Sequence, residues 1–565
     1  MGRGRVAPKT TASTLSLRGS TSQVAPLLLV ALLSACGAFA QTTTVRVDPS
    51  APLAGVGPVP REMVGLNMPV HTNPRQVALH AVTPPGTNGN WEALRALNVG
   101  LIRQWVNAPE CGLHDLDLPR DAPGDDTEFE EWLRAQLAAD SANWAAFDDY
   151  MRGLCGLGDG VRIMLNLPVP PVWLGPFRHH DRHAGELVDL RSGEIVGYDR
   201  FVEWSGLDAN RIGDAERFER LRRRFALFTE LLVAHVRADP LLREHATMLT
   251  LGNETDSGGE IVQNSVRWRM WVYGREANAR FNAGQPIRPI DEGVLQGLYF
   301  AMHDGARSAD PEGTIALGGP ETSWAHRQFE RDGRFWYLDW FIDGHNGVRG
   351  IGRDRIDLVT WHNYGFDYDY ASPARQLFEA YDRPTYLTEY NATLGGHGMN
   401  FMQRGAQTVA KVAAELAVTP GAAGAAFFKA AGGGFGAILS RETIWRTGAY
   451  FALKLVGDEI VGGRPVRCSV RGGAADTIGC LAVRRDDGST AVLLFNESAE
   501  AREVRLRLPG ERPWRITRIE LPVAEARNDY RDVRADEIVS ETLSARPAGV
   551  ATTLAPHGVV VAVTQ

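Results

Sequence analysis

Short runs of β-branched and apolar residues alternate with amphipathic helical stretches from about residue 63 to residue 429. This alternation is typical of repeated βα units, because each helix returns the chain to the start of the next parallel strand. The runs lie at 63–67, 99–105, 161–167, 247–254, 314–318, 356–362, 386–389 and 422–429. Eight βα units in succession predict a closed (β/α)8 barrel, the TIM-barrel fold.

Beyond about residue 434 the pattern changes to strands with period-two alternation, separated by Gly, Pro and Asp-Gly turns. This pattern predicts an antiparallel β-sandwich. Residues 43–47 alternate in the same way, and we expect them to add a strand to it. We therefore predict a catalytic barrel over 59–437 and an accessory β-sandwich domain over 41–58 plus 438–565.

The first 40 residues predict an export signal. A basic stretch precedes the short apolar run 27–35, which is too short to cross a bilayer. Ala38 and Ala40 give the small-x-small pattern of a cleavage site, whereas residues 33–36 resemble a bacterial lipobox that would lipidate Cys36. We expect a periplasmic or extracellular protein, with a lipoprotein tethered through Cys36 as the alternative. No later segment predicts a transmembrane helix.

Composition excludes several classes of function. The formal net charge of −8 gives no basic face for nucleic acid. The sequence has no CxxC or HExxH motif, so no metal site is expected, and no Gly-x-Ser-x-Gly elbow of a serine hydrolase. The 14 tryptophans suit a carbohydrate site, because indole rings stack on the apolar faces of sugars.

Four cysteines follow the leader: Cys111, Cys155, Cys468 and Cys480. An even number in an exported chain permits the disulfides Cys111–Cys155 and Cys468–Cys480. Cys468 and Cys480 flank a Gly-rich, turn-like stretch, which suits a bridge across a hairpin. Four free thiols are the alternative, and the spacing alone does not decide between them.

Two glutamates, Glu254 and Glu389, stand at the ends of the fourth and seventh predicted strands. The middle of a parallel strand is buried on both faces, where a carboxylate is costly, but the carboxyl ends of barrel strands form the active-site face. Two carboxyl groups facing each other there are the equipment for breaking a glycosidic bond. We predict that Glu254 is the acid/base and Glu389 the nucleophile.

Polar residues at neighbouring strand ends fit the same chemistry. Asn253 precedes Glu254, and its amide suits the 2-hydroxyl group of a sugar. Arg103, at the end of the second strand, is expected to keep the nucleophile ionised. His362 and Tyr364 end the sixth strand, from which they are expected to orient Glu389. Each of these residues, taken alone, also suits a purely structural role.

Four tryptophans near the expected mouth are candidate sugar platforms. They follow the second, third and fifth strands or lie on the sixth: Trp105, Trp173, Trp324 and Trp361. Each of them equally suits the apolar core.

The strand-end motifs resemble those of clan A glycoside hydrolases. Residues 388–393, Thr-Glu-Tyr-Asn-Ala-Thr, are similar to the nucleophile motif of glycoside hydrolase family 39, and residues 361–364 contain the clan's His-x-Tyr. The chain departs from the family at Thr255, where Pro usually follows the Asn-Glu pair. The resemblance implies a retaining (β/α)8 enzyme with xylosidase-like or related activity on β-linked poly- or oligosaccharides, and no metal or organic cofactor. The alternative is a non-catalytic carbohydrate-binding protein on the same scaffold.

Overall fold

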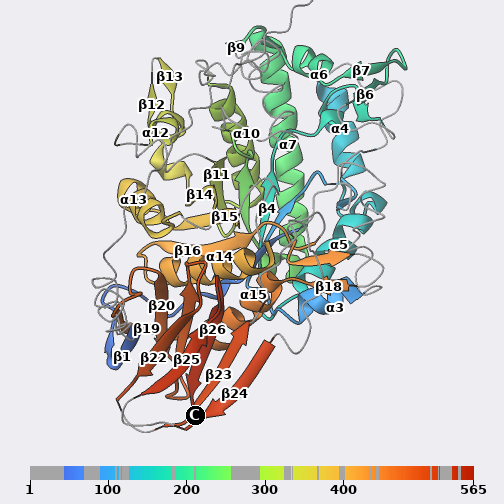
Figure 1. The fold of residues 1–565 in the computed structure, drawn as a ribbon. Helices are drawn as coiled ribbons and strands as arrows, with labels where there is room; N and C mark the ends of the chain where they lie inside the picture. The colour runs from blue at the N-terminus through green and yellow to red at the C-terminus, as the bar shows by residue number, and fades with distance from the viewer. Residues whose placement is uncertain are drawn as a thin grey trace, which may run out of the picture. The chain divides into compact units, whose positions relative to one another are not determined.

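Eight parallel strands close into a barrel in the computed structural model of the chain (Figure 1). In chain order they are β2 (Gly65–Asn67), β3 (Leu101–Trp105), β4 (Arg162–Leu167), β10 (Ala246–Leu251), β11 (Ala316–Thr322), β14 (Leu358–Tyr364), β15 (Thr385–Asn391) and β16 (Ala422–Phe427). Each strand pairs with its neighbour in sequence, and β16 pairs with β2 to complete the ring. The predicted fold class, a (β/α)8 barrel with a C-terminal antiparallel sandwich, is confirmed.

The structure describes residues 43–68, 89–108, 111–113, 116, 126–180, 186–208, 211–255, 293–323, 333, 335–345, 347–365, 368–392, 401–431, 436–440, 444–509, 512–519, 521, 538–544 and 549–565. The predicted signal peptide, the lipobox at Cys36 and Trp324 lie outside these residues. None of the helices in the described ranges has the length and hydropathy that crossing a bilayer requires.

The helices are amphipathic, and their apolar faces cover the barrel. They are α3 (Gly89–Arg95), α4 (Asp126–Gln136), α5 (Ala145–Cys155), α6 (Asp199–Trp204), α7 (Ala215–Ala238), α8 (Pro240–His245), α10 (Val294–Ala309), α12 (Trp336–Asp343), α13 (Ala371–Tyr381), α14 (Phe401–Leu416) and α15 (Gly448–Glu459). In α7, the side chain of Asp214 caps the N-terminus by accepting from the Arg217 amide, and Leu221, Phe225 and Leu232 form a buried stripe.

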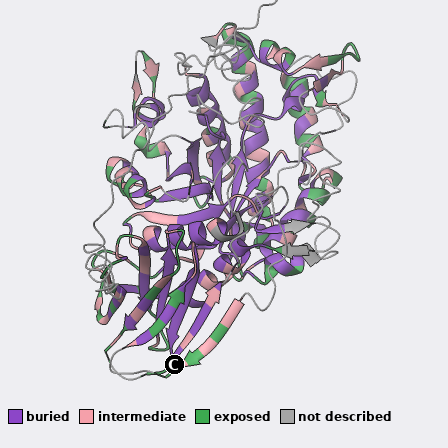
Figure 2. Cartoon of the chain, viewed as in Figure 1, coloured by how far each residue is buried: buried purple, intermediate pink, exposed green. Residues whose placement is uncertain are grey.

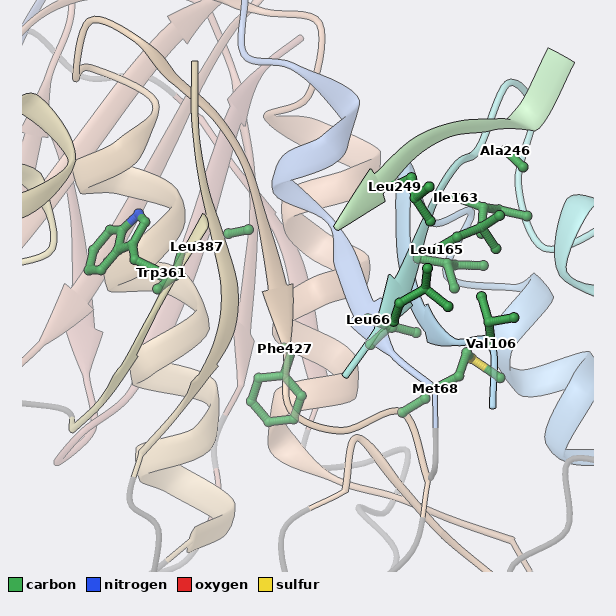
Figure 3. Close-up of a cluster of buried hydrophobic side chains, with 14 of the residues drawn as sticks. Leu66, Met68, Val106, Ile163, Leu165, Ala246, Leu249, Trp361, Leu387 and Phe427 are labelled. Carbon is green, nitrogen blue, oxygen red and sulfur yellow. The ribbon is translucent and has the colours of Figure 1, made fainter. Parts of the chain in front are cut away.

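Successive side chains along each barrel strand point alternately to two faces of the sheet, and both faces are buried. Residues that point outward join the layer beneath the helices, as Leu165, Leu249 and Leu387 do in Figure 3. Residues that point into the barrel form an apolar layer, which consists of Leu101, Met164, Met248, Leu358, Tyr386 and Ala426. Because both faces are packed, the strands are mostly buried, whereas the helices expose one side (Figure 2).

The C-terminal residues and β1 form a nine-stranded sheet. Its strands are β1 (Thr43–Pro52), β19 (Arg464–Arg471), β20 (Ile478–Arg484), β21 (Thr490–Asn496), β22 (Arg502–Arg507), β23 (Trp514–Ile519), β24 (Ile538–Leu543), β25 (Val550–Leu554) and β26 (Val559–Thr564). All neighbouring strands are antiparallel except β1 and β22. Side chains from both ends of the strand order, such as Val504 and Ile516, share one core, so the sheet folds over on itself as a sandwich.

The reverse face of β20, β21 and β26 joins the barrel core through α14 and α15. Two arginines, Arg485 and Arg515, bind the buried Glu459 of α15 at 2.5 and 2.7 Å. Lys411 of α14 binds Glu497 at 2.9 Å. The strand expected at 43–47 is present in this sheet, while the predicted domain limits stay a prediction.

Short strands form the remaining small sheets of the described ranges. They are β5 (Phe177–His179), β6 (Glu186–Asp189), β7 (Ile195–Gly197), β8 (Leu207–Asp208), β9 (Arg211–Ile212), β12 (Gly344–His345), β13 (Val348–Arg349), β17 (Ile438–Ser440) and β18 (Ile444–Arg446). The four cysteines are thiols in the structure. Cys468 and Cys480 lie on the paired strands β19 and β20, close enough that the protonation of one thiol affects that of the other.

Candidate active site

A polar layer lies directly above the apolar layer inside the barrel. Side chains two residues apart on a strand share a face, and five of the six apolar residues are followed by a polar one nearer the carboxyl end. These residues are Arg103, Asn166, Thr250, Thr360 and Thr388, all buried. Asn67 of β2 belongs to the same layer and donates to the backbone oxygen of Thr388 at 2.6 Å. The barrel interior thus changes from apolar to polar at the level where the strands end.

Glu389 of β15 is held from two sides. Nη1 of Arg103 donates to its Oε1 at 2.5 Å, and the hydroxyl group of Tyr364 donates to its Oε2. Nδ1 of His362 lies 3.6 Å from the same Oε2. Only 4% of Glu389 is exposed, so these contacts replace most of its hydration. The arrangement fixes the carboxylate in orientation and supplies it with a positive neighbour.

Glu254 follows β10 and faces the same centre. Its Oε1 lies 3.2 Å from Nδ1 of His362, and 4% of the residue is exposed. The backbone of Glu254 has a φ of 51°, which is uncommon for a residue other than glycine and is often found at functional sites. Its neighbour Asn253 accepts a hydrogen bond from Nη2 of Arg103 at 2.8 Å.

The two predicted catalytic carboxyl groups lie close together. One oxygen of Glu254, one oxygen of Glu389 and a ring nitrogen of His362 lie within 4.8 Å of one another. Carboxyl groups are about 5 to 5.5 Å apart in retaining glycosidases and roughly 6.5 to 9.5 Å apart in inverting enzymes, which must fit a water molecule between them. The approach of one oxygen pair to within 4.8 Å in this chain is nearer to the retaining spacing than to the inverting one.

A third buried carboxylate, Glu321, was not anticipated from the sequence. The fifth strand was expected to end at Gly318, but β11 continues to Thr322 and carries Glu321 into the polar layer. Its Oε2 lies 3.2 Å from Nε2 of His362 and accepts from the hydroxyl of Thr388 at 2.5 Å. A glutamate three residues beyond a predicted barrel strand is the signal that would have found it.

Charge pairing within the site shifts three pKa values. Burial by itself would lower the pKa of His362, but Glu389, Glu254 and Glu321 outweigh burial and raise it to about 9. Burial would raise the pKa of Glu321, yet Arg103, His362 and Thr388 lower it to about 2. Burial also opposes the charge of Arg103, whose pKa is nevertheless raised by Glu321 and Glu389. At neutral pH the centre therefore holds two cations among its carboxyl groups.

Burial, and then the charges of Glu389 and Glu254, raise the pKa of Tyr364 well above its usual value. The phenol therefore stays protonated and can act only as a donor to Glu389 at neutral pH.

The same centre is a poor fit for a metal ion. Glu254, His362 and Glu389 have the spacing that a cation could use. A histidine that binds a metal must be neutral, whereas the carboxylates around His362 raise its pKa to about 9. The guanidinium group of Arg103 also donates a hydrogen bond to Oε1 of Glu389, and its positive charge would repel a metal cation at that oxygen. The donor set suits proton and hydrogen-bond chemistry instead.

The predicted sugar platforms differ in position. Trp173 and Trp361 are 0% exposed and belong to the hydrophobic core, where Trp361 lies beside Leu387 (Figure 3). Nε1 of Trp173 donates to the backbone oxygen of Leu113 at 3.0 Å. Neither ring has a face open to a sugar. Trp105 is partly exposed at the end of β3, with the Arg103 guanidinium 5.9 Å from the centre of its ring.

Comparison with solved structures shows which known proteins share this fold. Solved structures similar to the chain include (β/α)8 glycoside hydrolases of clan A. Their sequence identity is low, so the similarity establishes the fold alone.

Among the similar structures are a glucosidase from Croceicoccus marinus and a bifunctional glucanase-xylanase from a metagenome library, each with a TM-score of 0.53 and 14% identity over 93% of this chain and 99% of that one. An α-L-arabinofuranosidase from Thermotoga maritima, in complex with arabinose, has a TM-score of 0.51 and 14% identity over 93% of this chain and 100% of its own. Residues 475–562 match the family model described as "D-apionate lactonase, C-terminal immunoglobulin-like domain". A search of curated protein sequences finds no match.

Proposed function

We propose that the protein is a retaining glycoside hydrolase that cleaves β-glycosidic bonds in poly- or oligosaccharides. The observation that carries this proposal is the approach of Glu254 and Glu389, from the ends of β10 and β15, to within 4.8 Å of each other and of His362. Two carboxyl groups at this spacing, on the carboxyl face of a barrel, have the geometry needed for double displacement.

In the first step, a carboxylate oxygen of Glu389 attacks the anomeric carbon as the bond to the leaving oxygen breaks. Glu254 transfers its proton to that oxygen, so the released sugar departs as a neutral alcohol and a glycosyl ester remains on Glu389. In the second step, Glu254 takes a proton from water, the resulting hydroxide attacks the anomeric carbon, and Glu389 leaves as a carboxylate. Two inversions give net retention of configuration.

The surrounding residues suit these roles. Arg103 and Tyr364 both donate to Glu389, and charge-assisted bonds of this kind keep a nucleophile ionised and aimed. Arg103 also donates to Oδ1 of Asn253, so the amide nitrogen of Asn253 points elsewhere. Since the described residues provide no acceptor for that nitrogen, we assign it to the 2-hydroxyl group of the bound sugar.

We propose the substrate class from the sequence motif at β15, the seventh strand of the barrel. Residues 388–393 are similar to the nucleophile motif of family 39, which favours a xyloside or related β-linked sugar. Of the predicted platforms in the described ranges, the partly exposed Trp105 is the one that we retain.

We further propose export under the direction of residues 1–40, with lipidation at Cys36 as the alternative. Mass spectrometry of the mature N-terminus separates the two outcomes.

A lactonase is the second candidate, because the family model matching residues 475–562 is named after D-apionate lactonase. A sugar-acid lactone is an internal ester, and the same carboxylates could assist attack on its carbonyl group. The matched residues form part of the nine-stranded sheet and include none of the site, so the glycosidase is the main proposal.

The test is a panel of nitrophenyl glycosides and sugar lactones, with the anomer of the first product identified by proton NMR. For the glycosidase we expect Glu389→Ala to lose almost all activity, and azide to restore part of it as a glycosyl azide of inverted configuration. Glu254→Gln should be impaired least with good leaving groups, which need little protonation. Glu459→Gln, a buried carboxylate outside the site, is the matched control. Wild-type rates in both site variants would exclude the assigned roles and favour a binding protein or another chemistry.

A further inference from the structure

Glu321 is buried too deeply to touch a substrate. Its side chain is 0% exposed, and its contacts are to protein groups within the polar layer. Nδ2 of Asn166 donates to Oε1 at 3.4 Å, and Nε of Arg103 lies 3.6 Å from the same oxygen. The other oxygen faces His362 and Thr388. A carboxylate that is fully buried and surrounded by donors must act through its neighbours.

His362 is the neighbour that connects Glu321 to the proposed chemistry. Its ring lies between two carboxyl groups, with Nε2 at 3.2 Å from Glu321 and Nδ1 at 3.2 Å from Glu254. An ionised carboxylate is only an acceptor, so Nε2 must carry a proton to bond with Glu321. What Nδ1 offers to Glu254 then depends on whether the ring is neutral or charged.

A neutral ring with its proton on Nε2 would present a lone pair at Nδ1. That lone pair would compete for the proton that Glu254 must deliver to the leaving oxygen. A charged ring instead donates from Nδ1, so it stabilises the carboxylate that forms on Glu254 when the proton leaves. Keeping the ring charged therefore removes a competing base and supplies a donor at the same atom.

We infer that Glu321 is a positioning residue that holds His362 protonated at both ring nitrogens, so that Nδ1 donates toward Glu254. This role rests on the proposed glycosidase function. Thr388 secures it, because its hydroxyl donates to the same Oε2 that faces Nε2 of His362 and so fixes the carboxylate in place.

The groups around His362 favour its charged form. Glu254, Glu321 and Glu389 approach the ring from β10, β11 and β15, and Arg103 of β3 opposes them. Tyr364, on the same strand as His362, stays neutral and donates to Glu389. Among the acidic groups, Glu321 is the one that takes no part in either chemical step, so its charge is constant while those of Glu254 and Glu389 change during turnover.

The direct test is nitrogen NMR of the His362 ring in the free protein, which needs no substrate. In the wild type we expect both nitrogens to remain protonated up to about pH 9. In Glu321→Gln the charge is lost while the shape is kept, and we expect ring deprotonation to begin about 1 to 3 pH units lower. Glu321→Asp, which keeps the charge, should recover part of that difference. Thr388→Val serves if Glu321→Gln does not fold, and it should shift the titration in the same direction.

The second readout is the pH dependence of kcat/KM. In Glu321→Gln the alkaline limb should move to lower pH together with the NMR titration, while the acid limb stays in place. Glu459→Gln, a buried carboxylate of α15 bound by two arginines, should leave both limbs unchanged. A His362 ring that titrates near its ordinary pKa of 6.5 in the wild type, or equally in both proteins, would overturn the inference. A loss of activity that is uniform across pH would also overturn it. If the protein proves not to be a glycosidase, the NMR result still decides the charge of His362.

Discussion

Replacing Arg103 is the perturbation that bears most directly on the charge arrangement of the site. The residue is 1% exposed, and its guanidinium group spans three partners: Glu389 and Asn67 through Nη1, and Asn253 through Nη2. Glu321 lies nearby at 3.6 Å. One planar fork therefore neutralises two carboxylates and orients two amides, which an ammonium group does not do.

The magnitude follows from these contacts. Arg103→Met removes the cation and leaves Glu321 and Glu389 with His362 as their cationic neighbour. Removing one partner of a buried ion pair costs about 3 to 5 kcal/mol, so we expect the free energy of unfolding to fall by that amount. Arg103→Lys keeps the charge but loses the fork. A hydrogen bond to a charged group contributes about 1.5 to 3 kcal/mol, and losing one such bond in the transition state lowers kcat/KM by about 10-fold to 100-fold.

The assay combines urea unfolding, followed by tryptophan fluorescence, with kcat/KM on the best aryl glycoside. Arg224→Lys is the matched control, because Arg224 is a buried arginine of α7 that donates to the Leu174 backbone and to Asp126, neither of which belongs to the proposed site. It should leave kcat/KM unchanged. Arg103→Met with wild-type stability, or Arg103→Lys with wild-type kcat/KM, would refute the reasoning.

Two further predictions concern His362 and the cysteine pair. Raising the His362 pKa from its ordinary 6.5 to about 9, at about 1.4 kcal/mol for each pH unit, corresponds to about 3 kcal/mol of stability. Because the folded-state value is the higher one, this contribution is complete below pH 6.5 and is lost as the pH rises through 9. Urea midpoints across that range should fall more steeply for the wild type than for His362→Gln, and parallel curves would contradict the assignment. Cys468 and Cys480, whose thiols already meet across β19 and β20, should form a disulfide when a small-molecule disulfide accepts their two hydrogens. Mass spectrometry should then show a loss of about 2 Da that Cys468→Ser abolishes, and two thiols that stay free in the folded protein under these conditions would contradict it.

The barrel was predictable from sequence because strand and helix periodicity is a local property of the chain. Each expected strand overlaps an observed one, and the positions of Glu254 and Glu389 at strand ends followed from the same pattern. The ends of strands were harder to predict. The fifth strand was predicted to end at Gly318, but β11 runs on through Gly319 and Pro320 to Thr322.

The tryptophans show a second limit. The sequence position of Trp361 predicted that it lies in the carboxyl half of a strand, but it did not predict which face of the strand carries its side chain. The neighbouring residues, Thr360 and His362, point into the barrel, so Trp361 points outward into the core. A sequence with apolar residues on both faces of a strand does not reveal which face is which, because both are buried.

The order of residues along the chain, by itself, determined the βα repeat, the polar strand ends and the pair of glutamates near them. Only the tertiary structure decided that Glu321 approaches His362 and that Arg103 joins Glu389 to Asn67 and Asn253. These residues come from six barrel strands or their ends, and Asn67 and Glu389, which both bind Arg103, are 322 positions apart in the sequence. Periodicity describes neighbours along one strand, whereas the charge of a buried group depends on every group that closure of the barrel brings within a few ångströms.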